Sequence, residues 1–400
     1  ASITEEISNI IEKDIYANIS RYIVYGTHLN LEGSIEFKVD NLIDNAQIVA
    51  KSSSDEEIII DTEYEYDDNI LSFSTIEEIN TGLNLETLET KDYIILLKVK
   101  FSNNQTKYYS PSNNSEYGNI EYYTLTRNNI NNKININFTT LNDIPILKLD
   151  ITPVNDLPEE VYDVVIDPGH GGSDGGAVSG RYTESEIVLD CANELKKQLE
   201  NIGLKVLLTR DGTESSEEDT VYNIYDEEGR VTIANESHAK ILISLHLNST
   251  EEDISDGGVE VYAPTNCDLT LAKSLADNIV EKANTEYSQM ENCKEEEGVY
   301  VKTIKIKNTS YFRSYKGIFD DVPYLFIIRE IGGIATGAYV DGKNGDYSEN
   351  KYRYSNIGVE GYLIELGYIN VNKDLNNILR NKNSYMEAIT NSINEFYKIK

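Results

Sequence analysis

The 400-residue chain contains no tryptophan, only three cysteines, seven prolines and four histidines. Basic residues are also scarce, since 35 Lys and Arg stand against 69 Asp and Glu and give a formal net charge of −34. Nucleic acid and anionic lipid bind proteins through basic patches that displace counterions, and a chain this acidic offers few such patches. We therefore expect no nucleic-acid partner.

Long hydrophobic runs are missing as well. No stretch approaches the roughly 18 to 20 consecutive apolar residues that a membrane span needs, so we expect no membrane insertion. The first residues, Ala1 to Glu6, lack the basic and apolar regions of a signal peptide. We expect that any such signal was removed or is not included in this sequence.

The three cysteines, Cys191, Cys267 and Cys293, are odd in number and show no metal-ligand spacing. We expect neither a disulfide framework nor a cysteine zinc site. Cys191 falls on an apolar helical stripe with Val188 and Leu195, so we predict that it is a small core residue.

Hydrophobic residues form 40% of the chain, which is enough for real cores, and a length of 400 residues predicts two domains. In residues 1–155, a short amphipathic helix over residues 4–14 precedes short runs rich in Ile, Val, Tyr and Thr, which polar turns separate. About seven short strands at this spacing predict an antiparallel β-sandwich, of which the immunoglobulin-like fold is one form. The clearest runs are Tyr22–Tyr25, Ser34–Val39, Glu57–Asp61, Asp92–Phe101, Tyr122–Thr126 and Ile134–Phe138.

The pattern changes after residues 151–160, where Pro153 and Pro158 are typical of a linker. Strand-like and helix-like segments then alternate, which predicts an α/β domain over residues 156–400 with a mainly parallel sheet flanked by helices. The expected strands are 161–166, 204–209, 241–246, 258–262, 324–329 and 361–366, and the expected helices are 184–201, 230–237, 268–287 and 384–397.

Functional groups collect at the carboxyl ends of strands in open α/β sheets, and two of the histidines lie there. His170 follows the strand over residues 161–166, and His246 ends the strand over residues 241–246. A single histidine in such a position often only caps its strand, but two at one edge of a sheet favour a shared site. His28 and His238 fall in predicted turns, and we expect solvated or capping roles for them.

A carboxylate opens the helix expected over residues 184–201. Thr183 and Glu186 fit a capping box, which leaves Glu184 free to point toward the strand ends. Two imidazoles and one carboxylate are a common ligand set of hydrolytic zinc, with one position left for water. Such chemistry also needs a general base, and Glu365 lies inside an apolar strand, where a lone carboxylate costs free energy unless it is paired or linked to a metal. The alternative for Glu365 is an exposed position on an edge strand.

The segment Val164–Gly172, with the sequence Val-Val-Ile-Asp-Pro-Gly-His-Gly-Gly, resembles the opening motif of the zinc-dependent N-acetylmuramoyl-L-alanine amidases of the amidase-3 type. The resemblance implies zinc ligands at His170, Glu184 and His246 and a catalytic carboxylate at Glu365. It covers residues 161–372 and says nothing about residues 1–155. Further segments match in the family's order at residues 183–184, 206–210, 230–235, 243–249, 258–262 and 364–369.

The resemblance implies a peptidoglycan hydrolase of the extracellular space or cell wall, which cleaves the amide between N-acetylmuramic acid and L-alanine with a zinc-activated water. Asn248 and Arg210 are expected to orient the site from outside the ligand set. Two alternatives stay open: a zinc peptidase that acts on the stem peptide, and a non-catalytic cell-wall-binding protein. Residues 1–155 are expected to bind a wall polymer or a protein partner, or to act as a spacer.

The chain departs from the family pattern at residues 330–359, an insertion before the strand that bears Glu365. Its glycine-rich beginning, residues 331–338, predicts either a mobile flap over the site or a surface decoration. Arg329 and Glu330, just before it, predict a surface ion pair. Residues 341–346 lack the ligand spacing of an EF-hand, so we expect a polar turn there and no calcium site.

Overall fold

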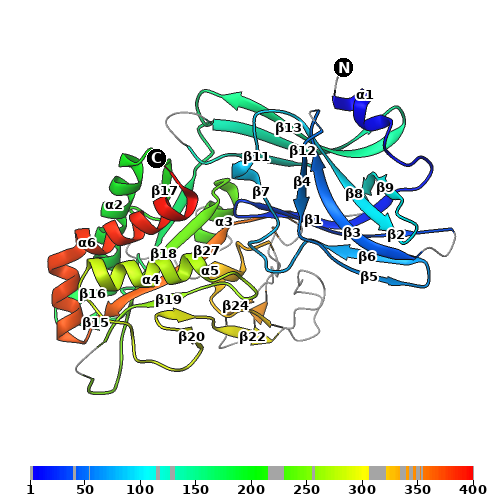
Figure 1. Cartoon of the computed structure of the whole chain (residues 1–400). Coiled ribbons are helices and arrows are strands. Elements are labelled where there is room, and N and C mark those ends of the chain that lie inside the picture. Colours follow the sequence, from blue (N-terminus) through cyan, green and yellow to red (C-terminus); the bar gives the residue numbers. More distant parts are fainter. Residues whose placement is uncertain are drawn as a thin grey trace. The chain divides into compact units, whose positions relative to one another are not determined.

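The computed structural model describes residues 3–38, 42–53, 55–113, 118–126, 131–214, 229–254, 257–305, 321–333, 339–341, 346–347, 352 and 355–399. The chain divides into two compact units (Figure 1). Unit 1 comprises Ala1–Leu125, Ile130–Leu157 and Tyr354–Ile357, and unit 2 comprises Thr126–Asn129, Pro158–Arg353 and Gly358–Lys400.

Unit 1 is built from two β-sheets. One sheet has the order β10-β1-β2-β6-β5, with β7 beside β2, and the other has the order β11-β12-β13-β8-β3-β4, with β9 beside β8. Their strands are β1 (Ala17–Tyr25), β2 (His28–Glu36), β3 (Ile43–Lys51), β4 (Glu57–Ile60), β5 (Glu63–Asp67), β6 (Ile70–Ser74), β7 (Leu83–Asn84), β8 (Tyr93–Phe101), β9 (Thr106–Tyr109), β10 (Pro111–Asn113), β11 (Ile120–Tyr123), β12 (Asn131–Leu141) and β13 (Ile144–Val154).

The predicted sandwich is confirmed, with more strands than expected. The antiparallel order β1-β2-β6-β5 in one sheet and β4-β3-β8-β9 in the other is the strand order of immunoglobulin-like sandwiches. The long hairpin of β12 and β13 extends the second sheet, and β13 ends at Val154. The linker that we expected from residue 151 is therefore wrong in its first residues, because these pair with β12 before the chain leaves the sheet.

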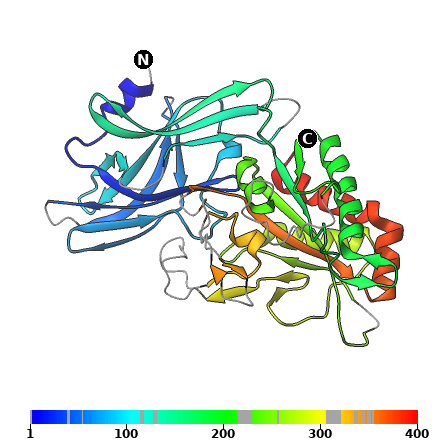
Figure 2. The same cartoon turned by 180° about the vertical axis from the view of Figure 1, so that it is seen from behind.

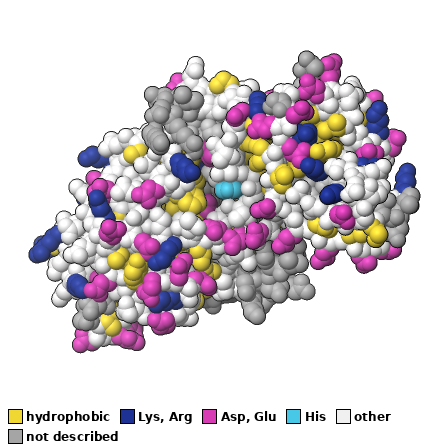
Figure 3. Space-filling view, in the orientation of Figure 1, with side chains coloured by type: hydrophobic (Ala, Val, Ile, Leu, Met, Phe, Trp, Pro, Cys, Tyr) yellow, Lys and Arg dark blue, Asp and Glu magenta, His cyan; other side chains and the backbone are white. Residues whose placement is uncertain are grey.

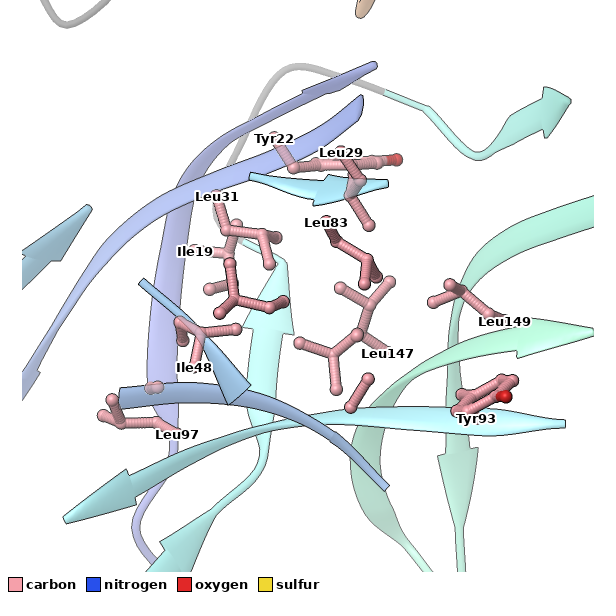
Figure 4. Close-up of a cluster of buried hydrophobic side chains, with 14 of the residues drawn as sticks. Ile19, Tyr22, Leu29, Leu31, Ile48, Leu83, Tyr93, Leu97, Leu147 and Leu149 are labelled. Atoms are coloured by element: carbon pink, nitrogen blue, oxygen red, sulfur yellow. The ribbon is translucent and has the colours of Figure 1, made fainter. Parts of the chain in front are cut away.

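The core of unit 1 lies between the two sheets. Figure 4 shows Ile19, Tyr22, Leu29 and Leu31 of one sheet directed toward Leu97, Leu147 and Leu149 of the other. β8 alternates between this core and a second apolar cluster on the outer face of its sheet, where α1 (Ile3–Ser8) contributes Ile7. The predicted helix over residues 4–14 is thus shorter than expected. Of the predicted apolar face, Ile7 is buried, whereas Ile10 lies beyond the end of α1 and stays 38% exposed.

Part of the expected insertion belongs to unit 1. The Val24 N–H donates to the Asn356 carbonyl at 2.9 Å, and Ile357 packs against the core of unit 1. The short strand β26 (Ile357–Gly358) pairs with β1. Residues 334–338 and 342–345 lie outside the described residues, and with them most of the expected flap and of the polar turn.

Unit 2 is an α/β unit around one mixed sheet, seen from behind in Figure 2. The neighbours β17, β14, β18 and β27 are parallel, while β19 runs antiparallel to β27 and parallel to β21. The sheet order is β17 (Val206–Leu208), β14 (Val164–Pro168), β18 (Ile241–Asn248), β27 (Glu360–Tyr368), β19 (Glu260–Tyr262), β21 (Val299–Tyr300) and β20 (Lys294–Glu296). This confirms the predicted mainly parallel sheet.

Helices cover both faces of this sheet. Val165, Leu242 and Leu363 form an apolar cluster with α3 (Arg230–Glu236) and α5 (Phe326–Arg329). Side chains alternate along a strand, so the neighbouring residues point to the opposite face. There α2 (Glu184–Asn201) contacts β14 and β18, and α6 (Asn372–Tyr397) packs against α2, α4 (Thr270–Lys282) and β27.

Three expectations for the elements of this unit are wrong. Residues 326–329 form a short helix instead of a strand, because a short apolar run fits a buried strand and a buried helix equally well. Arg329 and Glu330 form a buried ion pair with 3.1 Å between Nε and Oε1, not a surface pair, and they are 1% and 0% exposed. The closing helix begins at Asn372, well before the expected Ser384, and deviates from helical geometry at Asn381.

Cys191 and Cys267 are buried, Cys293 is partly exposed, and all three are free thiols. Cys191 packs on α2 with Val188 and Leu195, as predicted. Acidic side chains are spread over much of the face visible in Figure 3, as the net charge of −34 implies. None of the helices in the described residues is long and apolar enough to cross a membrane.

Candidate metal centre

His170 lies just past the carboxyl end of β14, on a backbone with a φ of 62°. This left-handed conformation turns the chain sharply after the strand. The imidazole Nδ1 lies 2.7 Å from Asp174 Oδ2, and the His170 carbonyl accepts a hydrogen bond from Arg230 Nη2 at 2.8 Å. Because Asp174 occupies Nδ1, Nε2 is the ring nitrogen that remains for a metal.

Glu184 is the first residue of α2 and is only 3% exposed. Its carboxylate accepts hydrogen bonds from the backbone N–H groups of Ala177 and Leu247, both at 2.9 Å. Thr183 precedes it as N-cap without a side-chain capping bond, so the predicted capping box with Glu186 is wrong. The backbone of β18 and of the loop at Ala177, rather than the cap, fixes the position of Glu184.

His246 completes the cluster from β18, the strand next to β14. Glu184 lies between the two histidines, with Oε2 3.1 Å from His170 Nε2 and Oε1 3.1 Å from His246 Nδ1. One ligand atom from each of the three residues lies within 4.8 Å of the others, and this is the one group of metal-ligand side chains found in the described residues. The donor set of two imidazoles and one carboxylate fits zinc with a position left for water.

The charges of the cluster favour this arrangement. Burial by itself would raise the pKa of Glu184, but the hydrogen bonds from His170 and His246 outweigh it and lower that pKa strongly. Burial would lower the pKa of His170, yet Glu184 and Asp174 raise it. An ionised carboxylate between two imidazoles is the state that binds a divalent cation.

Two glycines make room for this cluster. A Cβ on Gly169 would lie 2.3 Å from His246 Cε1, and a Cβ on Gly176 would lie 2.6 Å from Glu184 Oε2. Gly176 also has a φ of +67°, which favours glycine. The glycines around His170 in the sequence are therefore needed for the close approach of chain and ligands.

Glu365 lies on β27 directly opposite His246 of β18 on one side and Glu260 of β19 on the other. Its Oε2 is buried and has no hydrogen-bond partner among the described residues. Burial, with the negative charges of Glu184 and Glu260, raises its pKa well above the usual range. A carboxyl group with one buried, unpartnered oxygen and a raised pKa, beside this His-Glu-His cluster, is suited to proton transfer.

Arg210 and Asn248 lie beside the centre. Arg210 is 9% exposed and donates to the carbonyls of Pro168, Gly169 and Ser185 at 2.8–2.9 Å, so it ties the loop of His170 to the start of α2. Asn248 Nδ2 donates to Glu260. The other two histidines are elsewhere: His238 occupies the turn before β18, and His28 begins β2 in unit 1.

The sequence reasoning missed three carboxylates. Asp167 is 1% exposed and accepts hydrogen bonds from Thr209, Ser244 and Arg230 at 2.6–2.7 Å. Glu260 is fully buried, and Asp174 holds His170. Asp167 and Glu260 were visible in the sequence as carboxylates inside apolar strands, the same signal that singled out Glu365. Asp174 had no such signal.

An α/β sheet with a His-Glu-His cluster and a buried carboxyl group at the strand ends defines a metal-dependent hydrolase type of site. Residues 164–311 match the family model of the N-acetylmuramoyl-L-alanine amidases, so the chain contains a domain of this family. The chain is 35% identical over 111 residues to the germination-specific N-acetylmuramoyl-L-alanine amidase of Bacillus subtilis, a match over 26% of this chain and 47% of the relative. It is 29% identical over 159 residues to the amidase LytC of Bacillus subtilis, which covers 40% of this chain and 30% of LytC. The chain thus spans less than half of the length of these two relatives.

Among solved structures, the chain resembles the amidase AmiC2 of Nostoc punctiforme, with 24% identity, a TM-score of 0.38, and coverage of 60% of this chain and 98% of that one. It also resembles the CwlD amidase of Clostridioides difficile, solved in complex with the GerS lipoprotein, with 19% identity, a TM-score of 0.40, and coverage of 60% and 100%.

Proposed function

We propose that the protein is a peptidoglycan hydrolase of the cell wall that cleaves the amide between N-acetylmuramic acid and L-alanine. The observation that carries the proposal is the cluster of His170, Glu184 and His246 next to Glu365, whose Oε2 is buried without a hydrogen-bond partner among the described residues, inside a domain of the amidase family. We assign this chemistry to residues 156–400. For residues 1–155 we propose that they bind a wall polymer or a protein partner, or act as a spacer.

His170 Nε2, Glu184 and His246 would hold one zinc ion. Zinc in such a ligand set lowers the pKa of a bound water and polarises the scissile carbonyl. Asp174 keeps the His170 ring oriented, and Arg210 keeps the His170 loop in contact with the start of α2. Asn248 borders the site from the end of β18.

Glu365 serves as the general base and acid. In its ionised form it takes a proton from the attacking water, and it then donates this proton to the nitrogen of the leaving alanine. The burial of its Oε2 limits the access of solvent water to that oxygen. The elevated pKa of Glu365 suits the donating step, and a bound cation, which offsets the charge of Glu184, suits the accepting step.

The test is digestion of purified peptidoglycan by the zinc-loaded full chain, followed by identification of the new ends. We expect free L-alanine amino groups. Breaks inside the stem peptide would instead support a zinc peptidase, and bound zinc without any released peptide would support a wall-binding protein.

The matched variant is Glu365→Gln, which preserves shape and removes the proton-transfer group. We expect it to retain zinc and to lose amide cleavage. Either an active Glu365→Gln protein or a loss of zinc from it would reject this role for Glu365.

A further inference from the structure

A pocket of about 500 Å³ lies beside the metal centre in unit 2. Its walls are the end of β18, the end of β27, residues 288–292 and the segment that follows β18, which contributes Ser249, Thr250, Glu252, Ile254 and Gly257. Asn248 in one wall follows His246 by two residues, and Tyr368 in another follows Glu365 by three. The pocket therefore begins where the two strands that carry a metal ligand and the proposed base come to an end.

Glu260, which does not itself line the pocket, binds two of the lining residues. This carboxylate is 0% exposed and accepts hydrogen bonds from Tyr368 Oη at 2.9 Å, from Tyr262 Oη at 2.8 Å and from Asn248 Nδ2. Tyr368 Oη also lies 3.3 Å from Ser288 Oγ, and Ser288 is 1% exposed. Of these donors, Asn248 and Tyr368 line the pocket, and their hydrogen bonds to a buried charge fix their rotamers, so this part of the pocket is preformed.

The charge of the pocket is negative. Glu252 and Glu291 line it, and no Lys or Arg is among its lining residues. Glu291 lies 3.2 Å from Lys294, but this lysine is shared with Glu297 at 2.9 Å. Glu252 forms no ion pair within the described part of the chain, so its carboxylate can accept a cationic group from a ligand.

We propose that this pocket binds a primary ammonium group of the peptide part of the substrate, with Glu252 as its counter-ion. The inference rests on the proposed function: if the scissile amide lies at the metal centre, the peptide that follows it extends toward this pocket. Asn248 and Tyr368 offer polar groups to the peptide, and an anionic side chain is repelled. Two amines share this chemistry: the amino terminus that cleavage frees, and the side-chain amine of a diamino acid further along the peptide.

The experiment measures binding instead of turnover, with the zinc-loaded full chain and the tripeptide L-Ala-γ-D-Glu-L-Lys in a calorimeter. Glu252→Gln is compared with Glu251→Gln, which removes the same charge from an exposed neighbour that does not line the pocket. We expect Glu252→Gln to weaken binding about threefold to fivefold, as an exposed charge pair allows, and Glu251→Gln to leave it unchanged. Peptides acetylated at the amino terminus or at the lysine side chain identify the amine, because one acetylation abolishes the difference between the two variants.

The proposal is overturned if the tripeptide does not bind, if the two variants bind it equally, or if the effect of Glu252→Gln survives both acetylations. A chain that cleaves peptidoglycan but gives one of these results loses only the pocket assignment. A chain that shows the Glu252-dependent binding without amide cleavage loses the proposed function and keeps the pocket.

Discussion

The two units bury different kinds of polar group. Among the described residues of unit 1, the buried polar side chains are all neutral: Thr27, Asn30, Ser52, Thr75, Asn80, Ser110, Asn131 and Asn356. Unit 2 buries charges as well, namely Asp163, Asp167, Glu184, Arg210, Arg230, Lys240, Glu260, Arg329, Glu330, Glu360 and Asp374.

This difference indicates that the buried polar groups of the two units serve different purposes. Burying a charge costs free energy unless partners compensate it, so a β-sandwich that needs only a core avoids buried charges. In unit 2 several buried charges contact the candidate site: Arg210 and Arg230 bind the backbone around His170, and Glu260 binds two residues of the pocket. This contrast agrees with the proposed catalytic role of unit 2, and for unit 1 a binding or spacing role stays a prediction.

The largest effect is expected from Glu184→Gln. An amide in place of the central carboxylate removes a metal ligand and the anion between two imidazoles, so zinc binding and amide cleavage are both expected to fall by about 1000-fold or more. Glu186→Gln on the same turn of α2 is the control, because Glu186 is exposed and belongs to no ligand set. Metal analysis and peptide release measure the two effects. Equal loss in both variants would show that the charge of the helix start, not the ligand, matters.

Asp167→Asn tests the buried charges themselves. Asp167 pairs with Arg230 at 2.6 Å, and removal of its charge breaks this buried ion pair. We expect the free energy of unfolding of unit 2 to fall by about 3–5 kcal/mol.

The counterpart in unit 1 is Thr75→Val, which removes a hydroxyl that donates to Asn30 Oδ1 and accepts from Leu31 N–H, both at 2.9 Å. Loss of these neutral hydrogen bonds is expected to lower the free energy of unfolding of unit 1 by about 1–3 kcal/mol. Denaturant unfolding followed separately for each unit measures both variants. A larger loss for Thr75→Val than for Asp167→Asn would contradict the comparison between the units.

The sequence predicted what periodicity and strand ends encode. The helix over Glu184–Asn201, the mainly parallel sheet and the placement of His170 and His246 at one sheet edge follow from local patterns and from the rule on strand ends. Glu184 was chosen with a capping box that the structure does not contain, and its selection depended on the family resemblance. The helices and strands depend on the spacing of apolar residues, which can be recognised in one sequence without a structure.

The missed features depend on contacts between distant segments. The run Tyr324–Arg329 has no alternation, so its short helix is decided by packing against β27. Arg329 and Glu330 are charged and adjacent, as in many surface pairs, and only the fold buries them. Glu260 gains its role from Tyr368 and Asn248, which lie far from it in the chain.

Asp174→Asn is expected to have a smaller effect than loss of a ligand. Asp174 holds His170 Nδ1 at 2.7 Å, and an amide can keep the contact but not the charge. Loss of such a partner typically lowers metal affinity by about 10-fold to 100-fold. Zinc competition with a chelator measures this, and Asp253→Asn on an exposed loop is the control. Unchanged affinity would mean that the loop alone orients the ring.

The smallest effect concerns unit 1 and its pH dependence. Burial lowers the pKa of His28 to about 4, below its usual value of 6.5. Between these two values the unfolded chain binds a proton that the folded unit does not, so stability is complete above about pH 6.5 and is lost as the pH falls toward 4. We expect unit 1 to lose about 2 kcal/mol between pH 7 and pH 5, a range in which few carboxylates titrate. Denaturant unfolding of His28→Gln over the same range is expected to show a flat profile. If the stability of that variant depends on pH as steeply as that of the wild type, the acid sensitivity of unit 1 does not come from His28. A flat profile would show that unit 1, like unit 2, contains a titratable group whose burial affects its stability.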